Sequence, residues 1–173
     1  LRRLTSRARR RRAGSFTLAT VVCSAYPGGM ATRWLDAHEM EAWRTYIETY
    51  ADLITAIEHD LTAHGLTLGD YQVLVYLSEA EERSMRMCDL ADMLQLSPSG
   101  LTRRLDGLVK TGWVERRNSE LDRRVMLAAL TDDGRAKLAA AAPGHVDSVR
   151  RHMIDLLDED DHAAIARVFR KIR

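Results

Sequence analysis

The feature that most constrains the fold is the stretch 97–134, in which a capped helix leads directly into a short basic hairpin. Ser97 is a typical N-cap, and Pro98 follows at the first helical position, where its missing amide hydrogen costs little. Gly112 can end this helix before two short strands and a basic turn. A helix of this kind can enter the major groove of DNA while the hairpin tip reaches the neighbouring minor groove. The stretch therefore predicts a DNA-binding unit.

The uneven charge of the chain supports the same interpretation. Its formal net charge is only +1 over 173 residues. Residues 1–29 carry seven Arg and no acid, residues 30–96 carry four basic and thirteen acidic residues, and residues 127–173 carry eight of each. Residues 97–126, with seven basic and four acidic residues, are the net positive part of the remaining sequence. Phosphate attraction needs local positive charge, although a solvated charged face is the simpler alternative.

Length and composition favour an ordinary globular domain and give no sign of an enzyme. The two cysteines, Cys23 and Cys88, are too few for a disulfide scaffold, which favours a reducing cytoplasm. No apolar run reaches the roughly 18 residues of a membrane-spanning helix, so we expect no membrane association. Six scattered histidines, without a nucleophile and base pair, a phosphate loop or a metal-ligand spacing, predict no catalytic site, no metal and no cofactor.

The first 29 residues need a separate interpretation. Basic residues at 2–12 followed by an apolar segment at 16–23 superficially resemble a secretory signal, but the apolar segment is short and interrupted by threonines. The first methionine is Met30. We expect Met30 to be the natural start, with residues 1–29 an upstream extension or a disordered basic arm.

From Trp34 onward the pattern is helical. Apolar residues recur at spacings of three and four over about five turns, which predicts one long amphipathic helix. Gly65 is suited to end it, and Thr67 with Asp70 can form a capping box for a second helix. A third, shorter helix is expected after Arg86. The apolar stripe of the first helix consists of Trp43, Ile47, Tyr50, Ile54, Ile57 and Leu61.

The helix that follows Ser97 has an apolar face and a polar face. Small residues at Ser99 and Gly100 would let its N-terminus approach a phosphate closely. Arg103 is long enough to reach a guanine edge or a phosphate, and Thr102 could do either less strongly. The expected inward face consists of Leu101, Leu105, Leu108 and Val109.

The hairpin supplies further candidates for DNA contact. Arg116 and Arg117 continue its first strand toward the turn and are expected to contact phosphates. Arg123 and Arg124 lie near the tip, where a narrow minor groove would attract a guanidinium. Asp122 would repel phosphates unless it serves another group. We therefore expect Asp122 to pair with Arg124 and hold it extended, and a simple turn cap is the alternative.

Together these motifs resemble the MarR family of bacterial winged-helix transcription regulators. The resemblance is carried by Thr102 and Arg103 on the helix, the Asp-Arg-Arg tip at 122–124 and the Leu-Thr-Asp-Asp-Gly exit at 130–134. It covers about residues 34–173. The expected order of elements also agrees, with one helix, a three-helix unit, the wing and two C-terminal helices. Each motif is weak alone, and their joint spacing is specific.

The resemblance implies a mainly α (α+β) fold, in which a single domain combines a winged helix-turn-helix lobe at 66–130 with dimerisation helices at 34–64 and 131–173. It implies a sequence-specific, ligand-responsive repressor that binds double-stranded DNA as a homodimer on a near-palindromic operator. The wing motif of the family maps onto Asp122 and Arg124. The candidate DNA-binding residues are Ser97, Ser99, Gly100, Thr102, Arg103, Arg104, Arg116, Arg117, Asp122, Arg123 and Arg124.

The C-terminal segment is compatible with the implied dimer. Its apolar residues recur at helical spacing, and helices at both ends of the chain leave few other partners for so much apolar surface. An ordinary monomeric core is the alternative. Pro143 and Gly144 are expected to kink or break the long helix that follows Thr131. The apolar positions are Val146, Val149, Met153, Leu156, Leu157, Ile165, Val168, Phe169 and Ile172.

Regulation and alternative functions depend on other residues. Trp43, Tyr46 and Tyr50 are candidates to bind a small aromatic effector in a crevice between the dimerisation helices and the DNA-binding lobe, although such a stripe is also typical of a core. Cys88 could make the chain a redox sensor, but packing as a small hydrophobe is more usual. A winged helix that serves as a protein-interaction module is a further alternative, which would not need the clustered arginines.

Overall fold

The computed structural model describes residues 33–172. The described residues fall into two units, with the boundary between Met40 and Glu41. The expectations about residues 1–29 and Cys23 lie outside the described residues. Within the described part, no helix has both the length and the apolar character needed to cross a bilayer.

The first long helix, α2 (Ala37–Leu61), begins three residues later than its pattern starts. Asp36 and Glu39 explain this start, because each backbone N–H donates to the carboxylate of the other at 2.9 Å. Such a reciprocal cap satisfies two amides that would otherwise have no partner in the helix. From Glu41 onward, α2 belongs to the larger unit.

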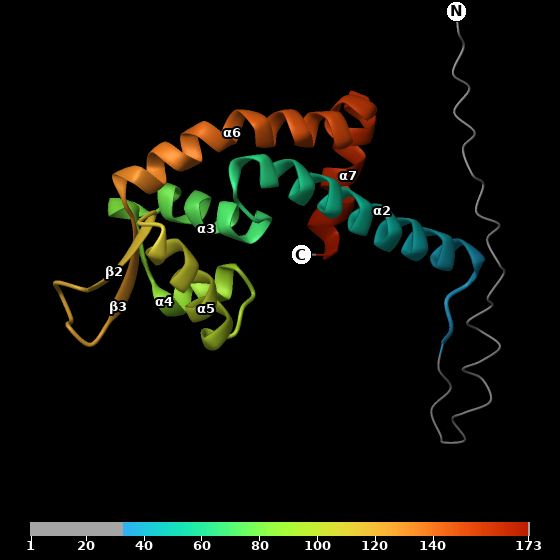
Figure 1. Cartoon of the computed structure of the whole chain (residues 1–173). Coiled ribbons are helices and arrows are strands. Elements are labelled where there is room, and N and C mark those ends of the chain that lie inside the picture. Colours follow the sequence, from blue (N-terminus) through green and yellow to red (C-terminus); the bar gives the residue numbers. More distant parts are fainter. Residues whose placement is uncertain (1–32, 173) are drawn as a thin grey trace, which may run out of the picture. The chain divides into compact units, whose positions relative to one another are not determined.

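The larger unit is mainly helical with one small sheet, as the sequence predicts (Figure 1). After α2, its helices are α3 (Leu68–Glu79), α4 (Met87–Met93), α5 (Pro98–Lys110), α6 (Asp132–His152) and α7 (Glu159–Ile172). Its strands are β1 (Ser84–Arg86), β2 (Val114–Asn118) and β3 (Met126–Leu130), and its 3₁₀ turns are η1 (Thr62–His64), η2 (Glu81–Arg83) and η3 (Ile154–Leu156).

The sheet is antiparallel, with β3 in the middle between β1 and β2. Val114 faces Leu130 across the hairpin, and Ser84 faces Ala129 on the other side of β3. β1 is a strand that the sequence pattern does not predict. A strand of three residues is too short to show alternation, and its backbone is satisfied by the distant β3 rather than by a local pattern.

The predicted helix ends are confirmed. Thr67 and Asp70 form the capping box of α3, and the Ser97 hydroxyl accepts the N–H of Gly100 at 3.1 Å at the start of α5. Gly65 and Gly112 have left-handed φ values of 62° and 77°, which glycine adopts without strain. The sequence predicts these helix ends because each cap depends on residues within one turn of the helix.

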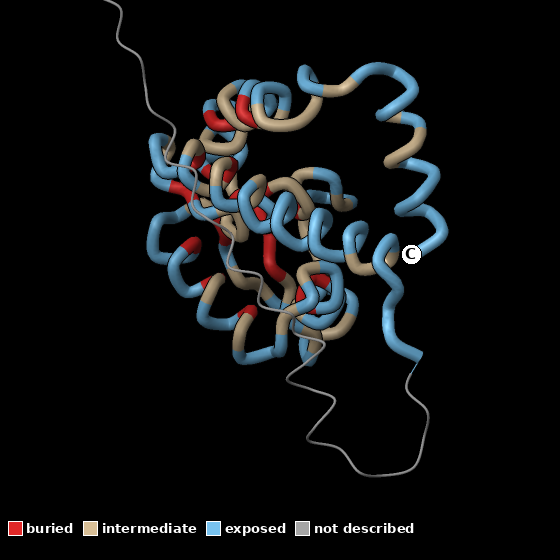
Figure 2. Tube along the Cα trace, turned by 90° about the vertical axis from the view of Figure 1, so that its right-hand side faces the viewer, coloured by how far each residue is buried: buried red, intermediate tan, exposed pale blue. Residues whose placement is uncertain are grey.

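The core lies where α3, α4, α5 and the sheet meet the end of α2, and it includes Ala141 of α6. Figure 2 shows the buried segments in red. On α5, Leu101, Leu105 and Leu108 are buried as predicted. Val109 was wrongly assigned to this face, since it is exposed. The turn of about 100° per residue places Val109 to one side of the line formed by the three buried leucines. Of the apolar stripe on α2, only Ile57 and Leu61 are buried in the described chain. The N-terminal half of the stripe therefore remains about half exposed within the described chain.

Of the kink or break predicted at Pro143, the break does not occur. α6 continues from Asp132 to His152 with Pro143 inside it. Proline removes one hydrogen bond of the helix, and packing of the flanking turns can sustain the rest. Ala141 and Ser148 on either side are both fully buried and anchor this part of the helix.

α6 is also joined to α2 by a polar cluster around Asp60. The buried Ser148 hydroxyl donates to Asp60 Oδ2 at 2.7 Å, and Arg151 and His152 place nitrogens 3.3 and 3.2 Å from the same oxygen. The Ser148 hydrogen bond is the main reason why the pKa of Asp60 is lowered. The carboxylate therefore fixes the C-terminal part of α6 to the end of α2.

Candidate nucleic-acid interface

The exposed face of α5 carries short polar side chains and two long cations, Arg103 and, at its end, Lys110. Ser99, Thr102 and Arg103 are all exposed, opposite the buried leucines. The Thr102 hydroxyl donates to the carbonyl of Pro98 at 2.9 Å, which orients its methyl group and its remaining lone pairs outward. No hydrogen bond or ion pair to another residue of 33–172 occupies the Arg103 guanidinium, which can therefore meet an external partner.

Arg104 points to the other side of α5. Its Nη1 lies 3.2 Å from Thr67 Oγ1 and 3.3 Å from Asp70 Oδ1, at the start of α3. Gly69 makes room for it, because a Cβ there would lie 2.2 Å from Arg104 Nη1. This arrangement ties α5 to α3 and gives no support to the predicted DNA contact of Arg104.

The paired arginines of β2 are likewise occupied within the protein. Arg116 Nη2 lies 2.9 Å from the Thr102 carbonyl oxygen and 2.8 Å from Asp106 Oδ1, both on α5. Arg117 Nη2 approaches Ser84 Oγ at 3.4 Å and Glu82 Oε2 at 3.9 Å. The two side chains therefore lie on opposite faces of the hairpin, as neighbours on a strand do. The expected phosphate contacts of both residues gain no support from this geometry.

The pairing predicted at the wing tip is confirmed. Asp122 Oδ1 accepts from Arg124 Nε at 3.2 Å and from its backbone N–H at 3.0 Å, and Oδ2 accepts from Nη2 at 3.3 Å. These bonds hold the pKa of Asp122 below its usual value. The Arg124 side chain is nevertheless 91% exposed. Arg123 beside it is also exposed, and its carbonyl accepts from the Asn118 amide.

Arg86 is a further cation near this surface, and it was not among the predicted site residues. It ends β1, is exposed, and its positive charge helps to lower the pKa of Asp122. The residue therefore lies near the wing tip, on the strand that sequence analysis did not predict. No local signal marks it, because its proximity to the wing depends on the pairing of Arg86 with Leu127 of β3.

The base of the wing is fixed to the start of α6. Thr131 caps α6 by accepting the N–H of Gly134 at 3.0 Å, and its hydroxyl donates to the carbonyl of Gly112 at 2.7 Å. The backbone N–H of Thr131 donates to the carbonyl of Trp113 at 3.2 Å. The end of α5, the wing and α6 therefore share one junction.

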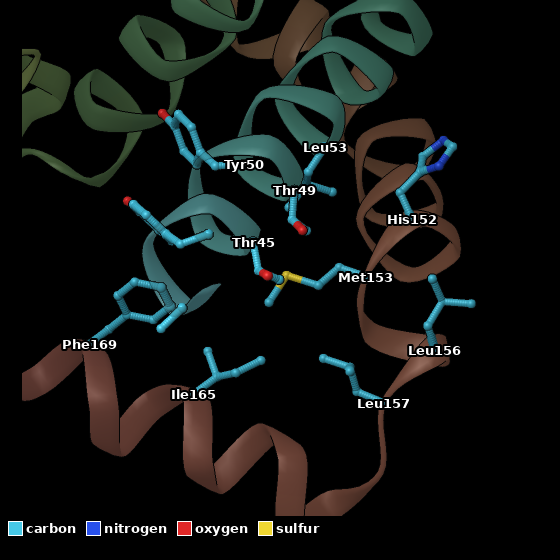
Figure 3. A pocket seen from close by; sticks show the side chains of 12 residues that line it. Thr45, Thr49, Tyr50, Leu53, His152, Met153, Leu156, Leu157, Ile165 and Phe169 are labelled. Atoms are coloured by element: carbon cyan, nitrogen blue, oxygen red, sulfur yellow. The ribbon is translucent and has the colours of Figure 1, made fainter. Parts of the chain in front are cut away.

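A cavity of about 670 Å³ lies among α2, the end of α6, η3 and α7 (Figure 3). Tyr46 and Tyr50 line it, and Trp43 does not. Its position differs from the expected crevice beside the DNA-binding lobe, because it lies among the helices expected to dimerise. The remaining lining residues are Ala42, Thr45, Thr49, Leu53, His152, Met153, Leu156, Leu157, Ile165 and Phe169.

Cys88 and metal binding are two further candidate chemistries. Cys88 is exposed near the start of α4, so the expectation that it packs as a small hydrophobe is wrong, and its thiol donates to Asp89 Oδ1 at 3.3 Å. Its redox role stays a prediction. Within residues 33–172, no group of three or more His, Cys, Asp or Glu side chains is placed to hold a metal ion.

Comparisons with known proteins agree with this geometry. The model of the MarR family matches residues 64–125. The chain is 42% identical to AbsC, a MarR family transcriptional regulator from Streptomyces coelicolor, with a TM-score of 0.78 and coverage of 82% of this chain and 95% of that one. Sco3205 from the same organism, a MarR family transcriptional regulator solved in complex with DNA, is 34% identical with a TM-score of 0.78, covering 83% and 91%. The HTH-type transcriptional repressor YetL of Bacillus subtilis is 28% identical over 126 residues, 73% of this chain and 75% of the relative.

Proposed function

The chain belongs to the MarR family, and on this premise we propose that it is a transcriptional regulator that binds double-stranded DNA sequence-specifically. The observation that carries the proposal is the pairing of an exposed polar face on α5 with an arginine-bearing wing tip. α5 would read base edges in the major groove, and Arg124, oriented by Asp122, would enter the minor groove. The DNA complex of the similar protein Sco3205 supports this assignment.

We propose that the functional unit is a homodimer. None of the residues of α7 is buried, yet Ile165, Val168, Phe169 and Ile172 recur at the spacing of one helix face. Trp43 and Tyr50 on α2 are each 53% exposed. A second copy is the simplest cover for this much apolar surface. The two α5 helices would then contact two half-sites about one DNA turn apart, which predicts a near-palindromic operator.

Repression and response to a ligand are the finer parts of the proposal. YetL, which resembles this chain over most of its length, is described as a repressor. The cavity beside Tyr46 and Tyr50 lies among helices that would join the two subunits, so that an occupant could change the geometry of the dimer. Because its lining is almost entirely apolar, we expect a small neutral aromatic effector rather than a charged one.

The experiment that tests the function is a selection of bound fragments from the genome of the organism, followed by titrations over a range of salt concentrations. We expect one preferred inverted repeat and a steep loss of affinity with rising salt. Binding without any sequence preference would contradict the proposal and leave only a basic surface. A monomer that binds single half-sites would contradict the dimeric part alone.

Replacing Asp122 by Ala is expected to weaken operator binding about three- to tenfold, because Arg124 loses the carboxylate that orients it. The loss occurs although the variant removes a negative charge from a DNA-facing tip. Fluorescence anisotropy with the selected operator measures it. In a variant that already carries Arg124→Ala, the same substitution should have little further effect, since the two residues act as one unit. Additive losses would show that Asp122 does not act through Arg124.

A further inference from the structure

The position of Arg116 suggests a role other than that of a DNA contact. Its Nη2 atom meets two groups that are one helical turn apart on α5, the Thr102 carbonyl oxygen at 2.9 Å and Asp106 Oδ1 at 2.8 Å. A helix carbonyl has a second lone pair, so Thr102 can accept this bond and still serve the helix. Arg116, on the wing, therefore contacts α5 through both a backbone group and a side chain of that helix.

The exposure of the side chains agrees with an internal role. The Arg116 side chain is 28% exposed, whereas that of Arg124 at the wing tip is 91% exposed. A guanidinium that contacts phosphate needs its donors directed outward, and at least one donor of Arg116 is directed at α5. The Asp106 partner remains 57% exposed. Within this ion pair the Arg116 cation is therefore the less exposed side chain and the Asp106 carboxylate the more exposed one.

Asp106 itself needs an explanation on a surface that would bind DNA. It lies on the exposed side of α5, one turn beyond Thr102 and next to the row that contains Arg103. An uncompensated carboxylate there would repel phosphates. Its ion pair with Arg116 offsets this negative charge and links α5 to β2. The acid is therefore better explained as part of the link between the wing and α5 than as a solvated surface charge.

We propose that Arg116 is a positioning residue for base reading: it fixes α5 against β2 through Thr102 and Asp106. This inference rests on the proposed function and goes beyond it, because it assigns specificity to a residue that contacts no DNA. Arg116 sets the orientation in which Thr102 and Arg103 are presented to base edges. The energy of a bidentate base contact depends strongly on this orientation.

Arg116→Met tests the proposal, since methionine keeps an unbranched apolar stem and removes the donors and the charge. Arg124→Met, at the exposed tip of the same wing, is the matched control. Both full-length variants are titrated with the selected operator and with a scrambled duplex from roughly 50 to 300 mM salt. For Arg116→Met we expect about a tenfold loss on the operator and a loss at least about threefold smaller on the scrambled duplex, where only the repulsion of phosphates by the uncompensated Asp106 carboxylate weakens binding.

The opposite pattern would overturn the inference. If Arg116 contacts a phosphate, Arg116→Met weakens both duplexes equally and reduces the magnitude of the salt slope by about 0.9. Arg124→Met is expected to weaken binding at the tip and shows that the assay detects the loss of a wing contact. Melting curves of both variants identify any general loss of structure.

Asp106→Ala provides a second test that does not depend on the folding of Arg116→Met. Asp106 is more than half exposed and alanine is a good helix former, so the variant should fold. Simple charge removal predicts tighter binding to both duplexes. Positioning predicts that the ratio of operator to scrambled affinity falls at least about threefold, and an unchanged ratio overturns the proposal.

The titrations of the wild-type protein distinguish a failure of the proposed function from a failure of the inference about Arg116. If the wild type shows no operator preference, the proposed function fails and the inference fails with it. If the wild type prefers its operator and Arg116→Met loses affinity equally on both duplexes, the inference alone is wrong.

Discussion

Gly134→Ala is expected to lower the free energy of unfolding by about 2–4 kcal/mol, because the site has no room for a methyl group. A Cβ at this position would lie 2.0 Å from the carbonyl oxygen of Trp113 and 2.8 Å from Leu130 Cδ1. The oxygen belongs to the backbone and already accepts the N–H of Thr131, so it cannot move without breaking the junction between the wing and α6. Urea denaturation at a fixed protein concentration measures the change.

Gly107→Ala is the matched control for this prediction. Gly107 lies inside α5, and a Cβ there would meet no atom within 4 Å. Alanine should therefore stabilise the protein by about 0.5–1 kcal/mol through its higher helix propensity. Equal stability of Gly134→Ala and the wild type would show that the backbone at the junction relaxes and that the close approach is not a constraint.

The close approach at Gly134 gives a physical reason for the exit motif of the wing. Thr131 caps α6 and bonds to the end of α5, and Gly134 allows the first turn of α6 to lie against the backbone of Trp113. The wing, α5 and α6 are therefore connected through backbone contacts. A change in the orientation of α6 would be transmitted to the wing through this junction, as the proposed response to a ligand requires.

The features that sequence predicted correctly are local. The caps at Thr67 and Ser97 depend on partners three residues away, and the pairing of Asp122 with Arg124 depends on a partner two residues away. Chain geometry alone brings these groups together, so residue type and spacing suffice. The hairpin and the leucine face of α5 follow for the same reason.

The features that sequence did not predict depend on distant partners. Arg104 and Arg116 were interpreted as DNA contacts because a cation on a basic segment resembles a solvent-facing cation. Their partners lie elsewhere in the fold: Asp70 is 34 residues from Arg104, and Thr102 is 14 residues from Arg116. Likewise, Ser148 reaches Asp60 across 88 residues. Side-chain direction is set here by tertiary neighbours, which periodicity does not identify.

Ile172→Glu is expected to dissociate the proposed homodimer, raising its dissociation constant by at least about 100-fold. Ile172 ends the apolar row of α7 and is 76% exposed within the described chain. In an isolated subunit a glutamate there would be solvated and harmless. In a dimer that covers the row, the same carboxylate would be buried without a partner, at a cost of several kcal/mol. Sedimentation velocity over a range of concentrations measures the change.

Leu121→Glu is the control that makes this result specific to α7. Leu121 is 98% exposed in the turn of the wing, away from the dimerisation helices, so the same change in charge and polarity should leave the oligomeric state unchanged. Ile172→Glu should also bind a full operator with the affinity of a single half-site, because the second recognition helix is no longer tethered to the first. A variant that remains dimeric at nanomolar concentration would show that the row on α7 faces solvent in the dimer, and the exposed stripe of α2 would then have to provide the contact between subunits.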